Sequence, residues 1–199
     1  MIKILFEQLY RLIFQPAKAW NILSEKAENT QSSLNKRQSE NDSFFKDYLY
    51  PAIGIVALLS FLGILFNRKE FDVQLALKAT ISATLSLFVG FYLASFLLSE
   101  AMGRLFSEEK HYRRCERFAG YSSALVYVLY MFLAVFPEFS FLYLLSLYSI
   151  YMIWEGATPY MHIAEDQKVK FTVIASAIIL LSPVLISKII YMTMPGMRI

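Results

Sequence analysis

Apolar residues fall into five long stretches along the chain, and polar residues gather between these stretches. The stretches cover residues 49–66, 79–98, 118–136, 139–154 and 171–187, and none contains Asp, Glu, Lys, Arg or His. A helix that crosses a bilayer needs roughly 20 consecutive apolar residues. An open sheet would leave backbone groups unpaired in lipid, so such stretches favour helices. The pattern therefore predicts an all-α, polytopic membrane protein with five transmembrane helices.

Composition bears on the alternative that these stretches are buried helices of a water-soluble protein. The 199 residues are 57% hydrophobic and only 18% charged, whereas a typical soluble domain carries about 25% charged residues. Helices that are apolar on every side also leave no polar faces to cover a soluble core. The membrane interpretation is therefore favoured, with residues 139–154 as the shortest of the predicted spans.

Basic residues are divided unevenly between the two sides of the membrane that five crossings create. Fourteen lie before the first span, between the second and third spans, or after the fourth, and five lie in the alternate segments. Cytoplasmic loops of membrane proteins carry the excess of Lys and Arg. The sequence therefore predicts a cytoplasmic N-terminus and a C-terminus on the outer side of the membrane.

A narrow polar stripe runs through residues 2–20, which are otherwise mostly apolar. Lys3, Glu7 and Arg11 recur every fourth residue, as on one face of a helix, and are spaced to form ion pairs. These charges interrupt the run, which is therefore neither a span nor a signal peptide. We expect an N-terminal amphipathic helix in the cytosolic membrane interface, anchored by Lys3, Arg11 and Trp20. The alternative is a helix that packs on the bundle without a lipid role.

A polar segment separates this helix from the first span. Residues 24–43 contain two apolar residues in twenty, a composition typical of a solvated linker. A docking arm for a partner is the alternative. We therefore divide the chain into an amphipathic helix at residues 1–23, a polar linker at 24–48 and a five-helix transmembrane domain at 49–199.

Small residues define one face of the second stretch. Ser82, Ser86, Gly90 and Ala94 lie four apart, a spacing that lets another helix approach closely. That helix belongs either to the same chain, which is the default expectation, or to a second copy. Pro183 lies inside the fifth stretch, where it predicts a kink.

Motifs of the common enzyme classes are largely missing. Glu108, Glu109 and Arg113 spell E-E-x-x-x-R, the opening motif of CAAX-type intramembrane proteases, but the histidine motifs that complete such a site are absent. No H-E-x-x-H, nucleotide-binding loop or G-x-S-x-G is present. Cys115, the single cysteine, supports neither an intramolecular disulfide nor a zinc cage. The sequence therefore predicts a protein that is not an enzyme and that has no cofactor and no metal.

A transporter or channel for a small solute or an ion is the alternative function. Ion pathways usually place ionisable groups within the membrane, and the five stretches contain none. Glu155, between Trp154 and Gly156 at the end of the fourth stretch, is the candidate functional carboxylate. The simpler interpretation is an interfacial residue paired with Lys168 or Lys170.

Several sequence marks occur in a fixed order along the chain. An early proline and tryptophan precede the polar linker, a proline opens the first span, Gly-Tyr-Ser opens the third, and Trp-Glu-Gly ends the fourth. The residues are Pro16, Trp20, Pro51, Gly120, Tyr121, Ser122, Trp154, Glu155 and Gly156. This order, with the five predicted spans, resembles the Yip family of membrane proteins in its bacterial form. The family is named for interaction with Ypt/Rab GTPases, and the resemblance covers nearly the whole chain.

The resemblance implies a polytopic protein with a cytosolic N-terminus and no enzymatic activity, in the plasma membrane of a bacterium. Eukaryotic members act in vesicle traffic with Rab GTPases, but their acidic N-terminal motif is missing here, and Leu125 stands near the place of their usual proline. We therefore expect a protein that organises partners in the membrane. The expected partners are membrane lipids, a membrane protein or a second copy of the chain, and no nucleic acid.

Overall fold

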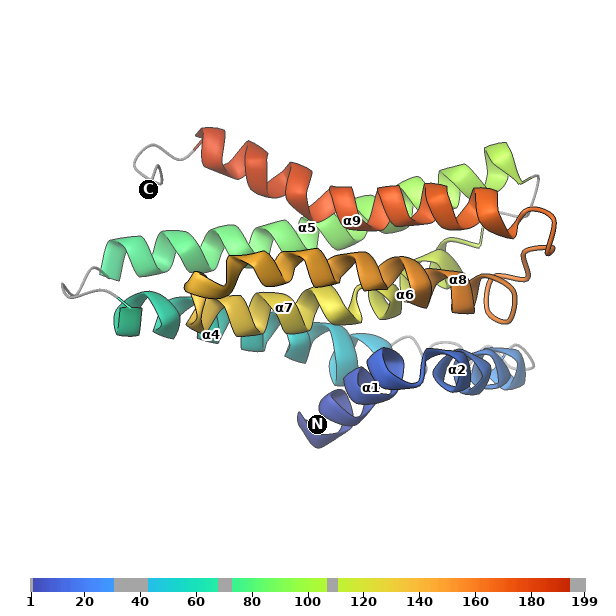
Figure 1. The fold of residues 1–199 in the computed structure, drawn as a ribbon, viewed down its shortest axis with the longest axis horizontal. Helices are drawn as coiled ribbons and strands as arrows, with labels where there is room; N and C mark the ends of the chain where they lie inside the picture. The colour runs from blue at the N-terminus through green and yellow to red at the C-terminus, as the bar shows by residue number, and fades with distance from the viewer. Residues whose placement is uncertain (1, 31–42, 68–72, 107–110, 194–199) are drawn as a thin grey trace.

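Helices make up every element of the described chain, which a computed structural model gives for residues 2–30, 43–67, 73–106 and 111–193 (Figure 1). Residues 31–42 of the predicted linker lie outside this description. The helices in chain order are α1 (Ile2–Phe14), α2 (Pro16–Thr30), η1 (Phe45–Leu49), α4 (Tyr50–Asn67), α5 (Val73–Leu105), α6 (Tyr112–Ser122), α7 (Ala124–Val135), η2 (Pro137–Leu147), α8 (Tyr148–Ala157) and α9 (Lys168–Thr193).

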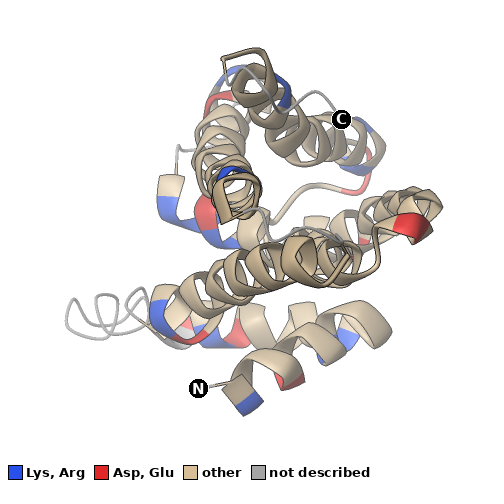
Figure 2. Cartoon of the chain, turned by 90° about the vertical axis from the view of Figure 1, so that its left-hand side faces the viewer, with Lys and Arg blue, Asp and Glu red and all other residues tan. Residues whose placement is uncertain are grey.

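The bundle is built around α5, the longest helix, which packs against α4, α6 and α9. The chain runs back and forth along the bundle, so that α4, α5, α7, α8 and α9 lie side by side in Figure 1. Their sequences are apolar on nearly every side, so the faces turned away from the core are apolar as well. Figure 2 shows long stretches of these helices without a charged residue.

Three helices are long and apolar enough to cross a membrane: Phe45–Asn67, Val73–Leu105 and Lys168–Thr193. The pair Tyr112–Ser122 and Ala124–Val135 makes a fourth crossing if the two are one broken span, bent by 43°. The bend lies at Ser123, whose hydroxyl donates a hydrogen bond to Ala119 O at 2.8 Å. Such back-bonding competes with the helical hydrogen-bond pattern and often bends helices. Length and composition thus give three or four crossings in the described chain, which does not confirm the predicted five.

The fourth predicted span takes a mixed form. Pro137 begins the 3₁₀-helix η2, and Phe139 departs from helical geometry at φ −87° and ψ 29°. No side chain of η2 is buried. The chain then continues as the short α-helix α8, so neither part alone has the length of a span.

The N-terminal helices lie together beside one end of the bundle (Figure 1). Pro16 ends α1 and begins α2, because a proline fits the first turn of a helix but not its interior. Helix α2 continues to Thr30, beyond the predicted boundary at residue 23. Phe44 and Tyr48, at the end of the predicted polar linker, are buried in the core, as is Leu49, the first residue of the predicted transmembrane domain.

Candidate functional site

Helix α1 has apolar side chains on two sides. Leu5, Leu9 and Leu12 are buried against the bundle. A second set is exposed beside the polar stripe: Ile2, Ile4, Phe6, Tyr10 and Phe14. Within the stripe, Arg11 Nη2 lies 2.6 Å from Glu7 Oε1 in an exposed ion pair. The helix therefore both packs on the protein and presents an amphipathic outer surface.

Two hydrogen bonds between residues that are far apart in the sequence attach α1 and α2 to α8. The hydroxyl of Tyr148 donates to the carbonyl oxygen of Ile13 at 2.9 Å. The indole Nε1 of Trp20 donates to the carbonyl oxygen of Met152 at 2.8 Å. Both acceptors are backbone atoms, so the position of the N-terminal helices depends on the path of α8 and on these two aromatic donors.

Trp20, a predicted interfacial anchor, has its whole side chain buried in the protein, with 0% exposure. Its ring stacks on Phe118 with centroids 5.0 Å apart. Gly156 makes the space: a Cβ built there would lie 2.5 Å from the indole. The indole thus fills a slot in the bundle, and the role of Trp20 as an interfacial anchor stays a prediction. Lys3 and Arg11 are exposed, and their role as anchors stays a prediction.

The small-residue face of α5 is turned toward the inside of the protein. Ser82, Ser86, Gly90 and Ala94 are all buried. A Cβ built on Gly90 would lie 2.8 Å from Pro183 Cα, so α9 passes very close to α5 at its own proline. The described structure therefore places a helix of the same chain against this face.

Glu155 lies on α8 and is partly exposed. Its carboxylate interacts with the hydroxyl of Tyr151, one turn earlier on the helix. The two lysines proposed as partners have other contacts. Lys168 Nζ lies 3.5 Å from Glu165 Oε1 and over the ring of Trp154. Lys170 donates to the carbonyl oxygen of Leu105 at 3.3 Å.

Glu116 on α6 is a buried carboxylate that the sequence reasoning missed, with only 5% of its surface exposed. Arg113 and Arg117 are close enough to interact with its charge. Its spacing held a signal, because Ala119 and Gly120 follow at three and four residues and share its side of the helix. Ala119 and Gly120 are buried, so Glu116 on the same side of α6 is buried as well.

The E-E-x-x-x-R motif gains no support as a site. Glu108 and Glu109 lie outside the described residues, and Arg113 is exposed at the start of α6. Cys115 is a buried free cysteine. Among the described residues, no three His, Cys, Asp or Glu side chains are grouped to hold a metal ion.

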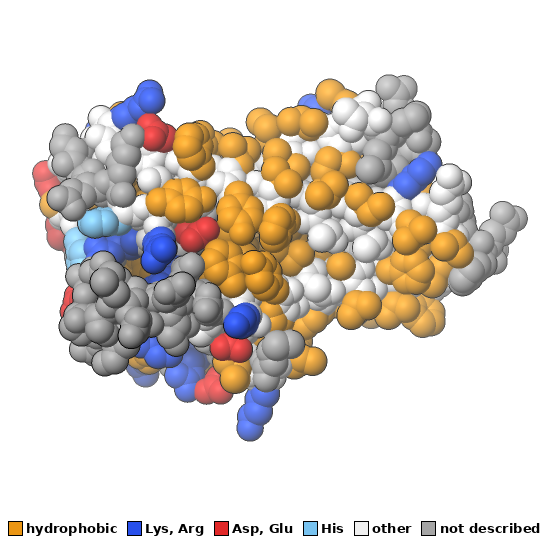
Figure 3. Space-filling view, turned by 180° about the vertical axis from the view of Figure 1, so that it is seen from behind, with side chains coloured by type: hydrophobic (Ala, Val, Ile, Leu, Met, Phe, Trp, Pro, Cys, Tyr) orange, Lys and Arg blue, Asp and Glu red, His pale blue; other side chains and the backbone are white. Residues whose placement is uncertain are grey.

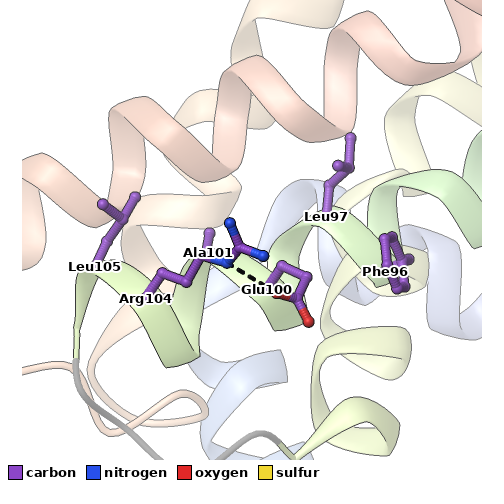
Figure 4. A pocket seen from close by; sticks show the side chains of 6 residues that line it. All are labelled: Phe96, Leu97, Glu100, Ala101, Arg104 and Leu105. Carbon is purple, nitrogen blue, oxygen red and sulfur yellow. Dashed lines mark hydrogen bonds and ion pairs between the residues drawn. The ribbon is translucent and has the colours of Figure 1, made fainter.

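A groove of about 500 Å³ runs along the last turns of α5 (Figure 4). Phe96, Leu97 and Leu105 form its apolar part. At its polar part, Arg104 Nε lies 3.0 Å from Glu100 Oε2. All of its lining side chains come from one helix, so the groove is a surface feature of α5 rather than a site built from several elements.

A smaller cavity of about 190 Å³ lies where the N-terminal helices meet the bundle. It is lined from α1, α2, the residues that open η1, α6 and the loop after α8. Its polar lining includes Gln8, Lys26, Asp47 and Arg117. We call this cavity the junction pocket.

The fold and surface define a helical membrane protein: long apolar helices expose hydrophobic side chains along the bundle, and the charged ones in Figure 3 lie mostly near one end. The family model for the Yip1 domain matches residues 35–187. The chain therefore belongs to the family of Yip1-domain proteins. No curated protein and no solved structure matches the chain.

Proposed function

We propose that the chain crosses the membrane five times, with a cytoplasmic N-terminus and an external C-terminus, in the plasma membrane of a bacterium. In this proposal it organises protein or lipid partners in the membrane and does not act as an enzyme. The uneven distribution of basic residues supports the orientation.

The length of η2 and α8 together supports the fifth crossing. A 3₁₀-helix rises about 2.0 Å per residue, so the 11 residues of η2 extend about 22 Å. The 10 residues of α8 add about 15 Å at the α-helical rise. The sum of about 37 Å exceeds the roughly 30 Å of the hydrocarbon core. Together η2 and α8, residues 137–157, thus have the length that a crossing needs.

The outer surface of α1 supports a place in the cytosolic interface. Its exposed Phe6 and Phe14 would contact acyl chains, while Lys3 and Arg11 would contact headgroups. Docking on the bundle does not compete with this role, because the docked face is the separate row of Leu5, Leu9 and Leu12.

The single observation that carries the organising role is that no side chain of η2 is fully buried, and of its hydrophobic side chains only Leu142 is partly buried against the core. Leu144 is 71% exposed, and Phe141 and Leu145 are also exposed. A crossing element with such a surface is open to lipid or to a helix of another protein. Helices in membranes associate through van der Waals packing and interhelical hydrogen bonds.

A photocrosslinking amino acid tests this role in native membranes. Placed at Leu144, it is expected to capture a membrane protein, a second copy of the chain or a lipid, identified by mass spectrometry. The matched control is the same amino acid at Leu87, which is buried on α5 and should form crosslinks only within its own chain. Equal capture at the two positions would contradict the proposal.

A flux assay in liposomes tests the transport alternative separately. The proposal expects purified protein to leave ion and small-solute flux unchanged. A saturable flux that is lost in Glu155→Gln would favour a transporter and would overturn the organising role.

A further inference from the structure

Three side chains of α8 form one exposed row along the helix. Tyr148, Tyr151 and Glu155 are spaced by three and four residues, so they share one side of α8. The rings of Tyr148 and Tyr151 are both exposed, and their centroids lie 5.4 Å apart. Glu155, at the end of the row, is partly exposed. We call these three side chains the α8 row.

The carboxylate of Glu155 has no ion-pair partner among the described residues. Its contact there is the hydroxyl of Tyr151, a neutral group. Lys168 instead contacts Glu165 and the ring of Trp154. Since an ionised carboxylate has about four acceptor positions, one hydroxyl leaves most of them open. The α8 row therefore presents a negative charge and open acceptor positions beside two aromatic rings.

An ammonium group complements this arrangement. It carries three N–H donors for the carboxylate. Its charge is also attracted to the face of a tyrosine ring within about 6 Å. An anionic headgroup lacks both interactions, and Glu155 repels it. The chemistry of the row thus selects a cationic group that can donate hydrogen bonds.

The length and the surroundings of the row favour a lipid over a small soluble amine. Tyr148 lies seven residues before Glu155, about 10 Å along the helix. The hydroxyl of Tyr148 donates to Ile13 O at 2.9 Å, which brings the end of α1 beside this part of α8. Leu147 on α8 and Phe14 on α1 are both exposed there. A ligand with its ammonium on Glu155 therefore meets an apolar surface further along, which acyl chains cover.

We propose that the α8 row binds phosphatidylethanolamine, with the ammonium on the Glu155 carboxylate and the Tyr151 ring and with an acyl chain along Tyr148. This lipid joins a primary ammonium to two acyl chains, whereas phosphatidylcholine has no N–H donor and phosphatidylglycerol has no cation. The proposal names a lipid partner for the proposed organising role, and it rests on the proposed crossing, which puts Glu155 at the cytosolic headgroups.

Lipid selection is measured on the full chain in nanodiscs that contain equal amounts of phosphatidylethanolamine, phosphatidylcholine and phosphatidylglycerol. Lipids that stay bound when the protein is released from the nanodisc are counted by native mass spectrometry. The test variants are Glu155→Gln and Tyr151→Leu. The matched control is Glu25→Gln, an exposed carboxylate of α2 with no aromatic residue three or four positions away.

The unaltered protein is expected to retain phosphatidylethanolamine in excess over the other two lipids. Glu155→Gln should lower this excess about fivefold, because it removes a hydrogen bond between charged groups. Tyr151→Leu should lower it about twofold to fivefold, because it removes the ring that attracts the ammonium. Glu25→Gln should leave the excess unchanged.

Methylation of the lipid amine tests the same contact without altering the protein. The monomethyl and dimethyl forms of phosphatidylethanolamine lose N–H donors one at a time and keep the positive charge. Their excess in the unaltered protein should fall with each methyl group toward the level of phosphatidylcholine.

Three results would overturn the proposal. The first is equal retention of phosphatidylethanolamine and phosphatidylcholine by the unaltered protein. The second is an equal loss in Glu155→Gln and Glu25→Gln, and the third is retention that does not change with methylation. The Leu144 crosslinking experiment probes η2 rather than α8, so the organising role can fail there while lipid selection at Glu155 persists, and the reverse holds as well.

Discussion

Replacing Trp20 with alanine should detach the N-terminal helices from the bundle. The indole is fully buried, stacks on Phe118 and donates a hydrogen bond to Met152 O. Truncation of a buried tryptophan to alanine typically destabilises a protein by about 3–5 kcal/mol, because a cavity remains. Trp20→Phe keeps most of the ring packing and loses the hydrogen bond, which contributes about 1 kcal/mol.

Trypsin cleavage after Lys18 or Lys26 measures this docking, since both lysines are exposed on α2. A helix must open locally before it is cleaved, and the cleavage rate then follows the population of the open form. A loss of 3 kcal/mol or more raises that population at least about a hundredfold. Trp20→Ala should therefore be cleaved about a hundred times faster than the unaltered protein, and Trp20→Phe about five times faster.

Phe14→Ala is the control, because Phe14 is an aromatic residue of the same region that is 67% exposed. Its cleavage rate should stay within about threefold of the unaltered protein. An unchanged cleavage rate for Trp20→Ala would refute the claim that the buried Trp20 side chain holds these helices on the bundle. Equal rates for Trp20→Ala and Trp20→Phe would show that the hydrogen bond, rather than ring packing, holds them.

The remaining predictions concern helix contacts and the candidate carboxylate. Gly63→Ala should reduce the free energy of unfolding by about 1–3 kcal/mol, because the new Cβ would overlap a backbone carbonyl of α7. The measurement is a lower melting temperature in detergent. In the control Gly54→Ala the new Cβ meets nothing within 4 Å, so this change should be neutral or stabilising by up to about 1 kcal/mol. Equal melting temperatures for Gly63→Ala and Gly54→Ala would contradict the packing of α4 on α7. Gly90→Ala should lower the melting temperature in the same assay, since its Cβ would lie 2.8 Å from Pro183 Cα. An unchanged melting temperature would contradict the close contact between α5 and α9. Glu155→Gln should leave liposome flux at the level of protein-free liposomes.

The long apolar helices could be predicted from the sequence because their signal is local and continuous. Residues 49–66 correspond to Tyr50–Asn67, and residues 171–187 lie within Lys168–Thr193. Apolar runs of this length have few structures open to them in lipid. The family resemblance also followed from the order of short marks, and the match to the Yip1 domain confirms it.

The departures arise where the structure depends on geometry that apolar runs do not encode. Residues 139–154 contain no charged position and no clear polar period, so they gave no sign of a 3₁₀-helix followed by an α-helix. The bend at Ser123 depends on one hydroxyl that turns back to the helix. Both features explain why length and composition give fewer crossings than the sequence pattern predicts.

Trp20 and Glu116 show the limit for individual side chains. An amphipathic aromatic beside a membrane suits the interface, but the slot for Trp20 is made by Gly156, which is distant in sequence. No pattern within residues 2–20 contains that information. Glu116 lies among arginine neighbours in the sequence, but Ala119 and Gly120 bring its side of α6 into the core.

Access to the two ends of the chain tests the five crossings most directly. A small tag at each terminus is probed in sealed cells with a reagent that does not cross the membrane. Five crossings predict that the C-terminal tag reacts in intact cells and that the N-terminal tag reacts only after the cells are opened. Reaction of both tags from the same side would mean an even number of crossings and would contradict the five-span topology.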